Sequence, residues 1–312
     1  MANTGRETNN PRIFRKIKVK TKAVIGEDIR EAKIRKLEKI ANQIRQDIIK
    51  ALLNAGSGHS AGPLGMVEVF TALYFHILNI RPKQPKWPDR DRFTLSNGHI
   101  NPVWYATLAH RGFFARREFV TSLRKLNTRM LGHPHNLATP GVENSGGPLG
   151  QGLSQAIGMS LAAKMDGKKY QVFCAMSDGE YDEGQIWEAI MFAGKNKLDN
   201  LTGIIDRNNI QIDGVTEDVM PLEPLRAKIE AFNWHVIEID GNNIRQVVEA
   251  CNQAYGIYER PVMIIAHTVP GKGVDFMEQD YKWHGIPPNK DQAKAALKQL
   301  RTLGGRIRSE HE

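Results

Sequence analysis

The chain has 312 residues, of which 41% are hydrophobic and 25% charged, and it carries a formal net charge of +9. This composition is ordinary for a globular protein and excludes a disordered chain, a collagen-like chain and a disulfide scaffold. No apolar run approaches the ~18 to 20 residues that span a bilayer, so we expect no membrane segment.

The excess positive charge is concentrated at the N-terminus. Residues 1–26 hold seven basic side chains against Glu7 alone, a net charge of +6, which leaves only +3 for the other residues. We therefore predict a basic tail over 1–27, interpreted as a solvated arm, and one folded domain over 28–312. A tail that touches RNA or an acidic partner, or a mitochondrial presequence, is the alternative. The body lacks a basic patch with interleaved aromatic residues, which argues against nucleic acid as a partner.

The first half of the body is predicted to be mainly helical. Apolar side chains recur at three- and four-residue spacings over residues 28–55, which indicates an amphipathic helix that ends at Gly56. Further helices are expected around 64–78, 101–111, 116–125 and 151–166, separated by loops rich in Gly, Pro and His.

From residue 170 onward, strands and helices alternate. Strands are expected over 170–176, 201–206, 236–239 and 261–268, and helices over 184–198 and 242–257. This alternation with short joints predicts an α/β fold, a parallel sheet with helices on both faces. Cys174 and Cys251 fall in apolar strand-like and helical runs, so we expect buried free thiols and a reducing, cytoplasmic compartment.

Four of the ten histidines stand beside glycine in predicted loops: His59, His99, His133 and His284. Glycine allows a positive φ and close approach of the backbone to a ligand. Imidazoles in such loops suit anion contacts and proton transfer near neutral pH. His76 and His110 lie instead in apolar periodic runs and are interpreted as core residues. We interpret the four loop histidines as a site, with a zinc site as the main alternative, although zinc would favour closer pairs of ligands.

Polar residues follow the first two of the alternating strands. Asp178 comes directly after strand 170–176, and Asn208 follows strand 201–206. The carboxyl ends of parallel strands are where open α/β sheets bind ligands. Carboxylate and amide oxygens are hard ligands for Mg²⁺ or Ca²⁺, and a backbone carbonyl near Ile210 could complete a face and leave positions for phosphate oxygens.

Taken together, the motifs resemble the N-terminal, thiamine-diphosphate-binding half of transketolase. The matching segments are 57–60 (SGHS), 91–99 (DRFTLSNGH), 131–134 (LGHP), 139–142 (TPGV), 147–152 (GPLGQG), 178–184 (DGEYDEG), 206–214 (DRNNIQIDG) and 283–285 (WHG). They follow one another in order, so the resemblance covers residues 30–300.

The resemblance implies how the cofactor thiamine diphosphate would be held. Asp178, Asn208 and the carbonyl of Ile210 would bind the Mg²⁺ or Ca²⁺ ion that bridges the diphosphate and neutralises its charge. Ser177 and Gly179 flank the aspartate and would lie against the cofactor. The family usually has glycine at the position of Ser177, so the diphosphate contact there departs from the family pattern.

Further residues acquire roles from the same resemblance. His99 and His284 would contact the diphosphate, and backbone groups of Gly147 and Leu149 would face the aminopyrimidine ring. The catalytic residues would be those that point toward the thiazolium and handle substrate hydroxyls and protons: His59, His133 and His284. His59 would also contact the cofactor. Glu183 would join an acidic network between the paired cofactor sites of the family dimer, or simply place a charge at a helix N-terminus.

The chain stops before the pyrimidine-binding and C-terminal domains of a full transketolase. The resemblance therefore implies the N-terminal subunit of a split transketolase, silent until a pyrimidine-domain subunit joins it in an α2β2 assembly. It would transfer a two-carbon ketol unit from a ketose phosphate to an aldose phosphate in carbohydrate metabolism, with pentose-phosphate or specialised sugars both open. The alternatives are the α chain of a 2-oxo acid dehydrogenase, against which the loop histidines argue, and a non-catalytic cofactor-binding regulator, against which the metal ligands argue.

Overall fold

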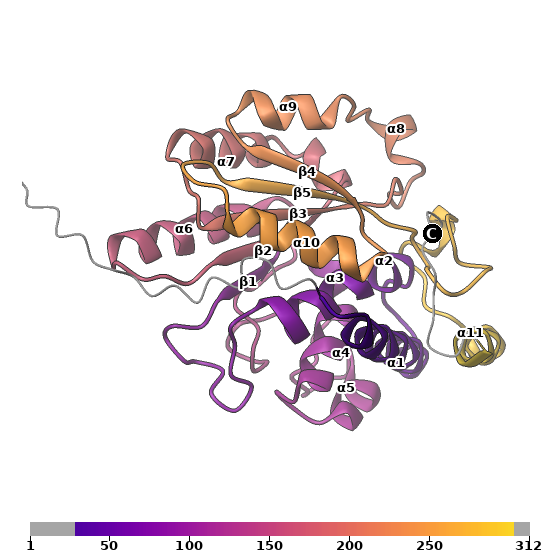
Figure 1. Ribbon diagram of the computed structural model, residues 1–312. Helices are drawn as coiled ribbons and strands as arrows, with labels where there is room; N and C mark the ends of the chain where they lie inside the picture. The colour runs from indigo at the N-terminus through magenta and orange to yellow at the C-terminus, as the bar shows by residue number, and fades with distance from the viewer. Residues whose placement is uncertain (1–28, 303–312) are drawn as a thin grey trace, which may run out of the picture.

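A computed structural model describes residues 29–302, so the predicted basic tail over 1–27 lies outside the described residues. Within them, five parallel strands form one sheet in the order β1–β2–β3–β5–β4 (Figure 1). The strands are β1 (Arg92–Leu95), β2 (Val172–Ser177), β3 (Leu201–Arg207), β4 (His235–Asp240) and β5 (Val262–His267). The predicted α/β fold with a parallel sheet is confirmed.

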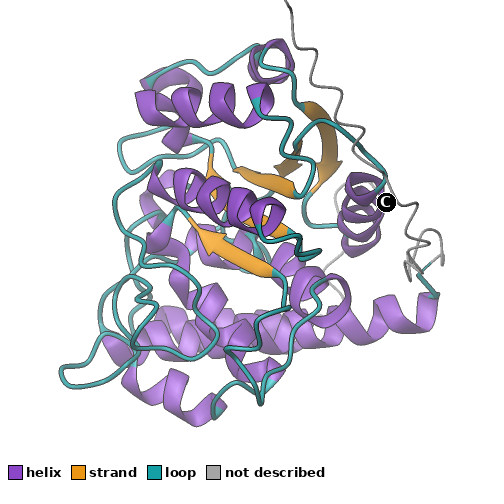
Figure 2. Ribbon diagram, turned by 90° about the vertical axis from the view of Figure 1, so that its left-hand side faces the viewer, coloured by secondary structure: helices purple, strands orange, loops and turns teal. Residues whose placement is uncertain are grey.

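Helices cover both faces of the sheet, as the views in Figures 1 and 2 show. One face packs against α6 (Gln151–Met165), α7 (Gly184–Lys195) and α9 (Leu225–Ala231). The other packs against α3 (Val67–Ala72) and α10 (Ile244–Tyr255). Beyond α3 lie α1 (Glu31–Ala55), α4 (Asn101–Arg111) and α5 (Arg116–Ser122), and α11 (Lys290–Thr302) packs on α1. The short helices α2 (Ala61–Gly65) and α8 (Thr216–Val219) complete the α-helices of the described residues.

Local sequence explains why the long helices begin and end where they do. The apolar stripe of α1 is buried, and the helix stops at Gly56, whose φ of 65° is left-handed and whose N–H donates to the Leu52 carbonyl. The predicted helix over 64–78 is divided into α2, α3 and a π-helical turn over Leu73–Ile77. The helix expected over 116–125 ends earlier, at Ser122, because Leu123 leaves the helical conformation with a ψ of 128°, and Arg124 then adopts a positive φ of 56°.

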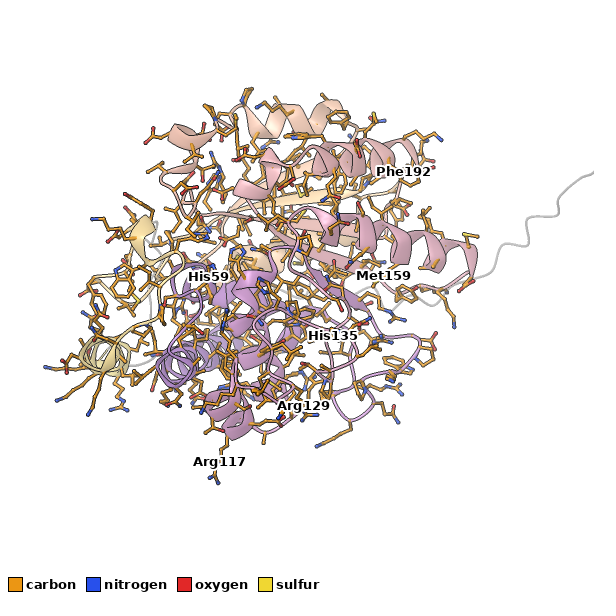
Figure 3. All side chains as sticks on the ribbon, turned by 180° about the vertical axis from the view of Figure 1, so that it is seen from behind. His59, Arg117, Arg129, His135, Met159 and Phe192 are labelled. Carbon is orange, nitrogen blue, oxygen red and sulfur yellow. The ribbon has the colours of Figure 1, made fainter. Side chains whose placement is uncertain are left out.

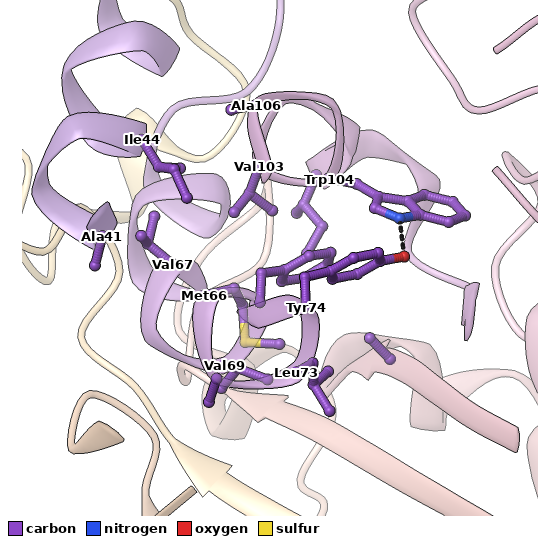
Figure 4. Close-up of a cluster of buried hydrophobic side chains, with 14 of the residues drawn as sticks. Ala41, Ile44, Met66, Val67, Val69, Leu73, Tyr74, Val103, Trp104 and Ala106 are labelled. Carbon is purple, nitrogen blue, oxygen red and sulfur yellow. Dashed lines mark hydrogen bonds between the residues drawn. The ribbon is translucent and has the colours of Figure 1, made fainter. Parts of the chain in front are cut away.

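The core between α1, α3 and α4 is aromatic and aliphatic (Figure 4). Trp104 and Tyr74 are buried there, and the indole Nε1–H of Trp104 donates to the Tyr74 hydroxyl at 2.5 Å. The bond satisfies a polar atom that burial would otherwise leave without water. Cys174 and Cys251 are buried and free, as predicted, and burial raises the pKa of the Cys251 thiol to about 12.

Several elements were not predicted from the sequence: β1, α8, α9 and α11. β1 has four residues, too few for a periodic pattern, and it exists as a strand because it pairs with β2 at the edge of the sheet. In the part of the chain that the structure describes, no helix is both long enough and apolar enough to cross a membrane.

Candidate active site

The carboxyl ends of β2 and β3 bring Asp178 and Asn208 together, as predicted. Ser177 pairs with Asp206 across the two strands, and the Asp178 side chain is fully buried just beyond them. The N–H of Asn209 donates to Asp178 Oδ2 at 2.8 Å, which joins the two strand ends directly. Burial raises the pKa of Asp178, while the charge of Arg207 and backbone hydrogen bonds act against that rise.

Three oxygens at this edge of the sheet have lone pairs available for a ligand. Among the described residues, Asp178 Oδ1 accepts one hydrogen bond, from Gly179 N–H at 2.8 Å, and Asn208 Oδ1 accepts one, from Ile210 N–H at 3.0 Å. Ile210 lies opposite Val215 in an antiparallel bridge of the non-hydrogen-bonded kind, so its carbonyl points away from that residue. The three predicted ligand groups therefore have lone pairs available for a cation.

The donor set suits a hard cation rather than zinc. Over residues 29–302, no group of three or more His, Cys, Asp and Glu side chains is placed to hold a metal ion. A metal at this edge would need amide and backbone oxygens beside the single carboxylate of Asp178, which are ligands for Mg²⁺ or Ca²⁺. The residues present thus fit the predicted ion.

Three of the four loop histidines converge from distant parts of the chain. The ring centroids lie 4.8 Å apart for His59 and His99, 5.5 Å for His59 and His284, and 5.2 Å for His99 and His284. Figure 3 shows His59 near the middle of the molecule, whereas Arg117 and Phe192 lie at its periphery. The imidazole cluster is thus a product of the fold, built from the loops after α1, β1 and β5.

Burial favours the neutral form of the clustered imidazoles. Burial, with the charges of neighbouring histidines and Arg124, lowers the pKa of His59 to about 4, and burial also lowers the pKa of His99 and of His284. The Nδ1 atoms of His59 and His284 are buried and have no hydrogen-bond partner in the described chain. A neutral imidazole can donate from one nitrogen and accept at the other, so these atoms are available to a bound molecule.

His133 joins the group through a glycine. Its side chain is exposed, and a Cβ added to Gly147 would lie 3.8 Å from the His133 ring. A Cβ on Gly98, next to His99, would lie only 2.9 Å from the Gly147 nitrogen. The backbones of these two loops therefore touch, and glycine at 98 is required by the contact.

The histidines and the metal ligands lie in one region. A Cβ added to Gly285 would lie 3.6 Å from the Ile212 side chain and 3.8 Å from the His59 ring. Ile212 belongs to the loop that follows Asn208 and Ile210. The turn of His284 therefore rests against both the histidine cluster and the predicted metal loop.

Two predicted positions are less central. The Leu149 carbonyl accepts a hydrogen bond from Gln185 Nε2 at 2.8 Å, so one of its backbone groups already has a partner. Glu183 is exposed at the N-cap of α7 and makes no capping hydrogen bond. Both of its interpretations, the interface network and the helix-terminal charge, remain predictions.

Glu180 is a site residue that sequence reasoning missed. It is fully buried and ties three loops together by accepting from Gly150 N–H at 2.6 Å, from Ser177 N–H at 2.8 Å and from the Ser96 hydroxyl. Burial raises its pKa to about 7. The signal was an acid within the Asp-Gly turn itself, directly before the buried Tyr181.

Asn97 and Arg207 were also missed. Asn97 is buried two residues before His99, and neither atom of its amide has a hydrogen-bond partner in the described chain. The Arg207 side chain is 4% exposed and pairs with Asp178 at 3.1 Å. A charged residue at the end of an apolar strand was the available signal for Arg207.

Comparison with known proteins identifies one family over most of the chain. The family model of the transketolase thiamine diphosphate binding domain matches residues 36–304. A 6-deoxy-6-sulfo-D-fructose transketolase subunit of Clostridium sp. (strain MSTE9) is 42% identical over 268 residues, which cover 86% of this chain and 97% of the relative. One of the subunits of an apulose-4-phosphate transketolase from Phocaeicola vulgatus is 40% identical, over 85% of this chain and 93% of the relative.

The fold gives the same result. A solved transketolase of Pichia stipitis, in complex with sedoheptulose 7-phosphate, superposes with a TM-score of 0.81 at 31% sequence identity. The match covers 86% of this chain and 40% of that longer chain.

Proposed function

We propose a function for this chain on the basis of its family. It belongs to the transketolase family, whose thiamine-diphosphate-binding domain it matches over residues 36–304. It is one subunit of a thiamine-diphosphate-dependent transketolase and corresponds to the N-terminal part of longer transketolases. The chain spans 40% of the Pichia stipitis chain but 97% and 93% of two relatives that are themselves named as subunits. That contrast is the observation that carries the proposal.

The cofactor would be held through a divalent cation at the ends of β2 and β3. Asp178, Asn208 and the Ile210 carbonyl would bind Mg²⁺, or Ca²⁺, because their oxygens retain unused lone pairs. Ser177 and Gly179 would line the diphosphate beside them. The buried, unpartnered Nδ1 atoms of His59 and His284 support binding of a polar group next to the cation.

The remaining cofactor contacts would come from the loops around Gly147. His99 would contact the diphosphate with His284, and the backbones of Gly147 and Leu149 would face the aminopyrimidine. The left-handed φ of 151° at Gly147 and its lack of a side chain leave room for a flat ring against the loop.

When bound, thiamine diphosphate supplies a thiazolium that serves as an electron sink for the two-carbon ketol unit. The chain's own contribution is to orient hydroxyl groups and to move protons. His59 and His284 each have a ring nitrogen without a partner in the described chain, and burial favours their neutral form, so each can accept a proton from a substrate hydroxyl and later return it. His133, exposed beside Gly147, would hold a hydroxyl farther out.

A pyrimidine-domain subunit would complete the enzyme, in an α2β2 assembly. The exposed apolar side chains Met191 and Phe192 on α7, with Met220 after α8, support burial against another chain. Glu183, exposed at the start of α7, would then face the acidic network between paired sites. We further propose a single diphosphate-binding domain over 28–312 and action in the cytoplasm.

The substrates would be a ketose phosphate donor and an aldose phosphate acceptor. The two subunit relatives are named for a sulfonated fructose and for apulose 4-phosphate, so the proposed class is a ketose with an anionic group at its far end. The ketose members of the pentose phosphates, the pentulose phosphates, belong to this class.

Reconstitution tests the proposal. The full chain is purified, supplied with thiamine diphosphate and Mg²⁺, and assayed with and without a candidate chain that resembles the pyrimidine-binding domain. Donors are a pentulose 5-phosphate, apulose 4-phosphate and 6-deoxy-6-sulfo-D-fructose. We expect ketol transfer only in the mixture. Turnover by the lone chain at the rate of the mixture would refute the split-enzyme proposal.

A further inference from the structure

Arg207 connects the proposed metal ligand to a pair of glutamates. Its guanidinium, at the carboxyl end of β3, is almost completely buried. Nη1 donates to Asp178 Oδ2 at 3.1 Å, and Nη2 contacts Glu217 at 2.5 Å and Glu223 at 3.1 Å. One buried cation is thus shared between the carboxylate inside the site and two more accessible carboxylates.

The same contacts organise the chain after β3. Glu217, on α8, also accepts the N–H of Leu222, and Glu223 accepts the N–H of Leu225 at the start of α9. Thr216 donates its hydroxyl to Asp178 Oδ2 at 3.3 Å. The loop that carries Asn208 and Ile210 is therefore held by bonds that end on Oδ2 of Asp178, and Oδ1 is the oxygen turned toward a ligand.

The position of Arg207 has two opposite electrostatic consequences. A carboxylate as buried as Asp178 is unstable without a compensating charge, and Arg207 supplies that charge before any metal arrives. A fixed positive charge next to a ligand oxygen also repels a divalent cation, and burial of both side chains weakens the screening of that repulsion. Glu217 and Glu223 reduce this repulsion, because they pair with the same guanidinium and partly neutralise its charge.

We propose that Arg207 is a positioning residue that takes the place of the metal's charge in the metal-free chain: it keeps Asp178 and its loop assembled while holding the affinity for the cation down. The inference rests on the proposed metal site. A purely structural tether predicts that loss of Arg207 weakens cation binding, whereas a counter-charge predicts that it strengthens binding. The direction of the change therefore separates the two roles.

The test measures Mg²⁺ binding without any assay of turnover. The full chain is titrated with Mg²⁺ at a fixed, saturating concentration of thiamine diphosphate, and the melting temperature is recorded at each step and in EDTA. Arg207→Met keeps an unbranched apolar stem and removes the guanidinium and its charge. We expect it to lower the melting temperature in EDTA and to reduce the Mg²⁺ concentration at half effect about tenfold.

Matched variants make the result specific. Arg207→Lys keeps the charge and should retain the wild-type midpoint. Glu223→Gln, on a well-exposed side chain, keeps an oxygen that can accept the N–H of Leu225 but leaves Arg207 less neutralised, and it should raise the midpoint two- to threefold. Arg226→Met removes an arginine whose ion pairs are all exposed, with Glu230 and Glu238, and should change nothing.

Each outcome decides a different claim. A wild-type chain that does not respond to Mg²⁺ contradicts the metal site of the proposed function. A wild-type response with an unchanged or raised midpoint in Arg207→Met contradicts the role of Arg207 alone, as does a midpoint for Arg207→Lys that matches the Met variant. If Arg207→Met does not fold by circular dichroism, Glu223→Gln decides, and an unchanged or lowered midpoint there overturns the inference.

Discussion

Two buried charge clusters of this molecule each pair an arginine with a carboxylate, and they differ in which carboxylate oxygens the arginine contacts. In the helical layer, Arg45 of α1 donates to both oxygens of Glu68 of α3, at 2.5 and 2.6 Å. In addition, Arg45 Nε donates to the Lys272 carbonyl and Nη2 donates to the Leu64 carbonyl, each at 3.0 Å. At the sheet edge, Arg207 contacts one oxygen of Asp178, and the other keeps a free lone pair.

The difference lies in which carboxylate oxygens the arginine contacts, not in burial, since all four side chains are buried. Arg45 contacts both oxygens of Glu68, and its bonds run from α1 to α3 and to the loop after β5, so its role is to hold elements together. Arg207 contacts only Oδ2 of Asp178, and among the described residues Oδ1 accepts only the N–H of the neighbouring Gly179. We interpret the two-oxygen pair as a structural clamp and the carboxylate with one oxygen outside its ion pair as a binding site.

Substitution of the site histidines should give the largest effect and leave the clamp untouched. We expect His59→Ala, His133→Ala and His284→Ala each to lower turnover of the assembled enzyme ~10²- to 10⁴-fold, because each loses a proton-transfer group. His133→Ala should keep its cofactor affinity, and His59→Ala and His284→Ala, which also lose a cofactor contact, should keep much of it. His99→Ala should weaken cofactor binding most. Turnover and cofactor Kd are measured on the same preparation.

His135→Ala is the matched control for the His133 variant. His135 lies two residues away on the same loop, is exposed, and accepts a local hydrogen bond from Leu137 N–H (Figure 3). It should keep wild-type turnover. Full turnover in His133→Ala would remove that residue from the site.

Glu68→Gln should have the converse effect. It leaves the charge of Arg45 buried without its partner, so we expect the free energy of unfolding to fall by ~3 to 5 kcal/mol. Urea unfolding of the full chain measures this loss, and the affinity for thiamine diphosphate under folding conditions should not change. Glu31→Gln, in exposed pairs with Arg35 and Arg245, should cost less than ~1 kcal/mol. A large loss of cofactor affinity in Glu68→Gln would erase the distinction between the two clusters.

A second buried carboxylate with several ion-pair partners gives a pH-dependent test. Asp47 is buried, which raises its pKa, but hydrogen bonds from His110, Arg116 and Lys50 outweigh that and bring its pKa to about 2, below the ordinary 3.8. A depressed carboxyl pKa stabilises the fold above about pH 4, and the stabilisation is lost as the pH falls toward 2. We expect about 2 kcal/mol of unfolding free energy to disappear over this window.

Asp47→Asn should make the free energy of unfolding less dependent on pH at acid pH. The measurement is the free energy of unfolding by urea at steps between pH 5 and pH 2 for both chains. A loss of stability with falling pH that is as steep in the Asn variant as in the wild type would mean that other carboxyls account for it.

Asp178→Ala should weaken cofactor binding, and the expected change in free energy is the smallest apart from the control variants. It removes the one carboxylate ligand that we assign to the cation, so the diphosphate charge is left uncompensated. Calorimetry on the assembled enzyme should show cofactor affinity reduced at least tenfold, ~1.4 kcal/mol. An unchanged affinity would be incompatible with the metal assignment.

Local sequence patterns were enough to predict the elements in which apolar side chains recur at a regular spacing or form an apolar run. The stripe of α1 with its terminal glycine, the apolar strands β2, β3 and β5, and the positions of Asp178 and Asn208 at two strand ends were all readable, because periodicity and strand polarity are properties of short segments. The motifs also sufficed for the family.

Tertiary structure alone decided which loops meet. The convergence of His59, His99 and His284 within 5.5 Å, the three loops tied by Glu180, and the pairing of Arg207 with Asp178 join residues that lie far apart in the chain. β1 is a strand only because β2 lies beside it. Contacts of this kind carry no period in the sequence, since their geometry is set by the packing of the whole sheet and its helices.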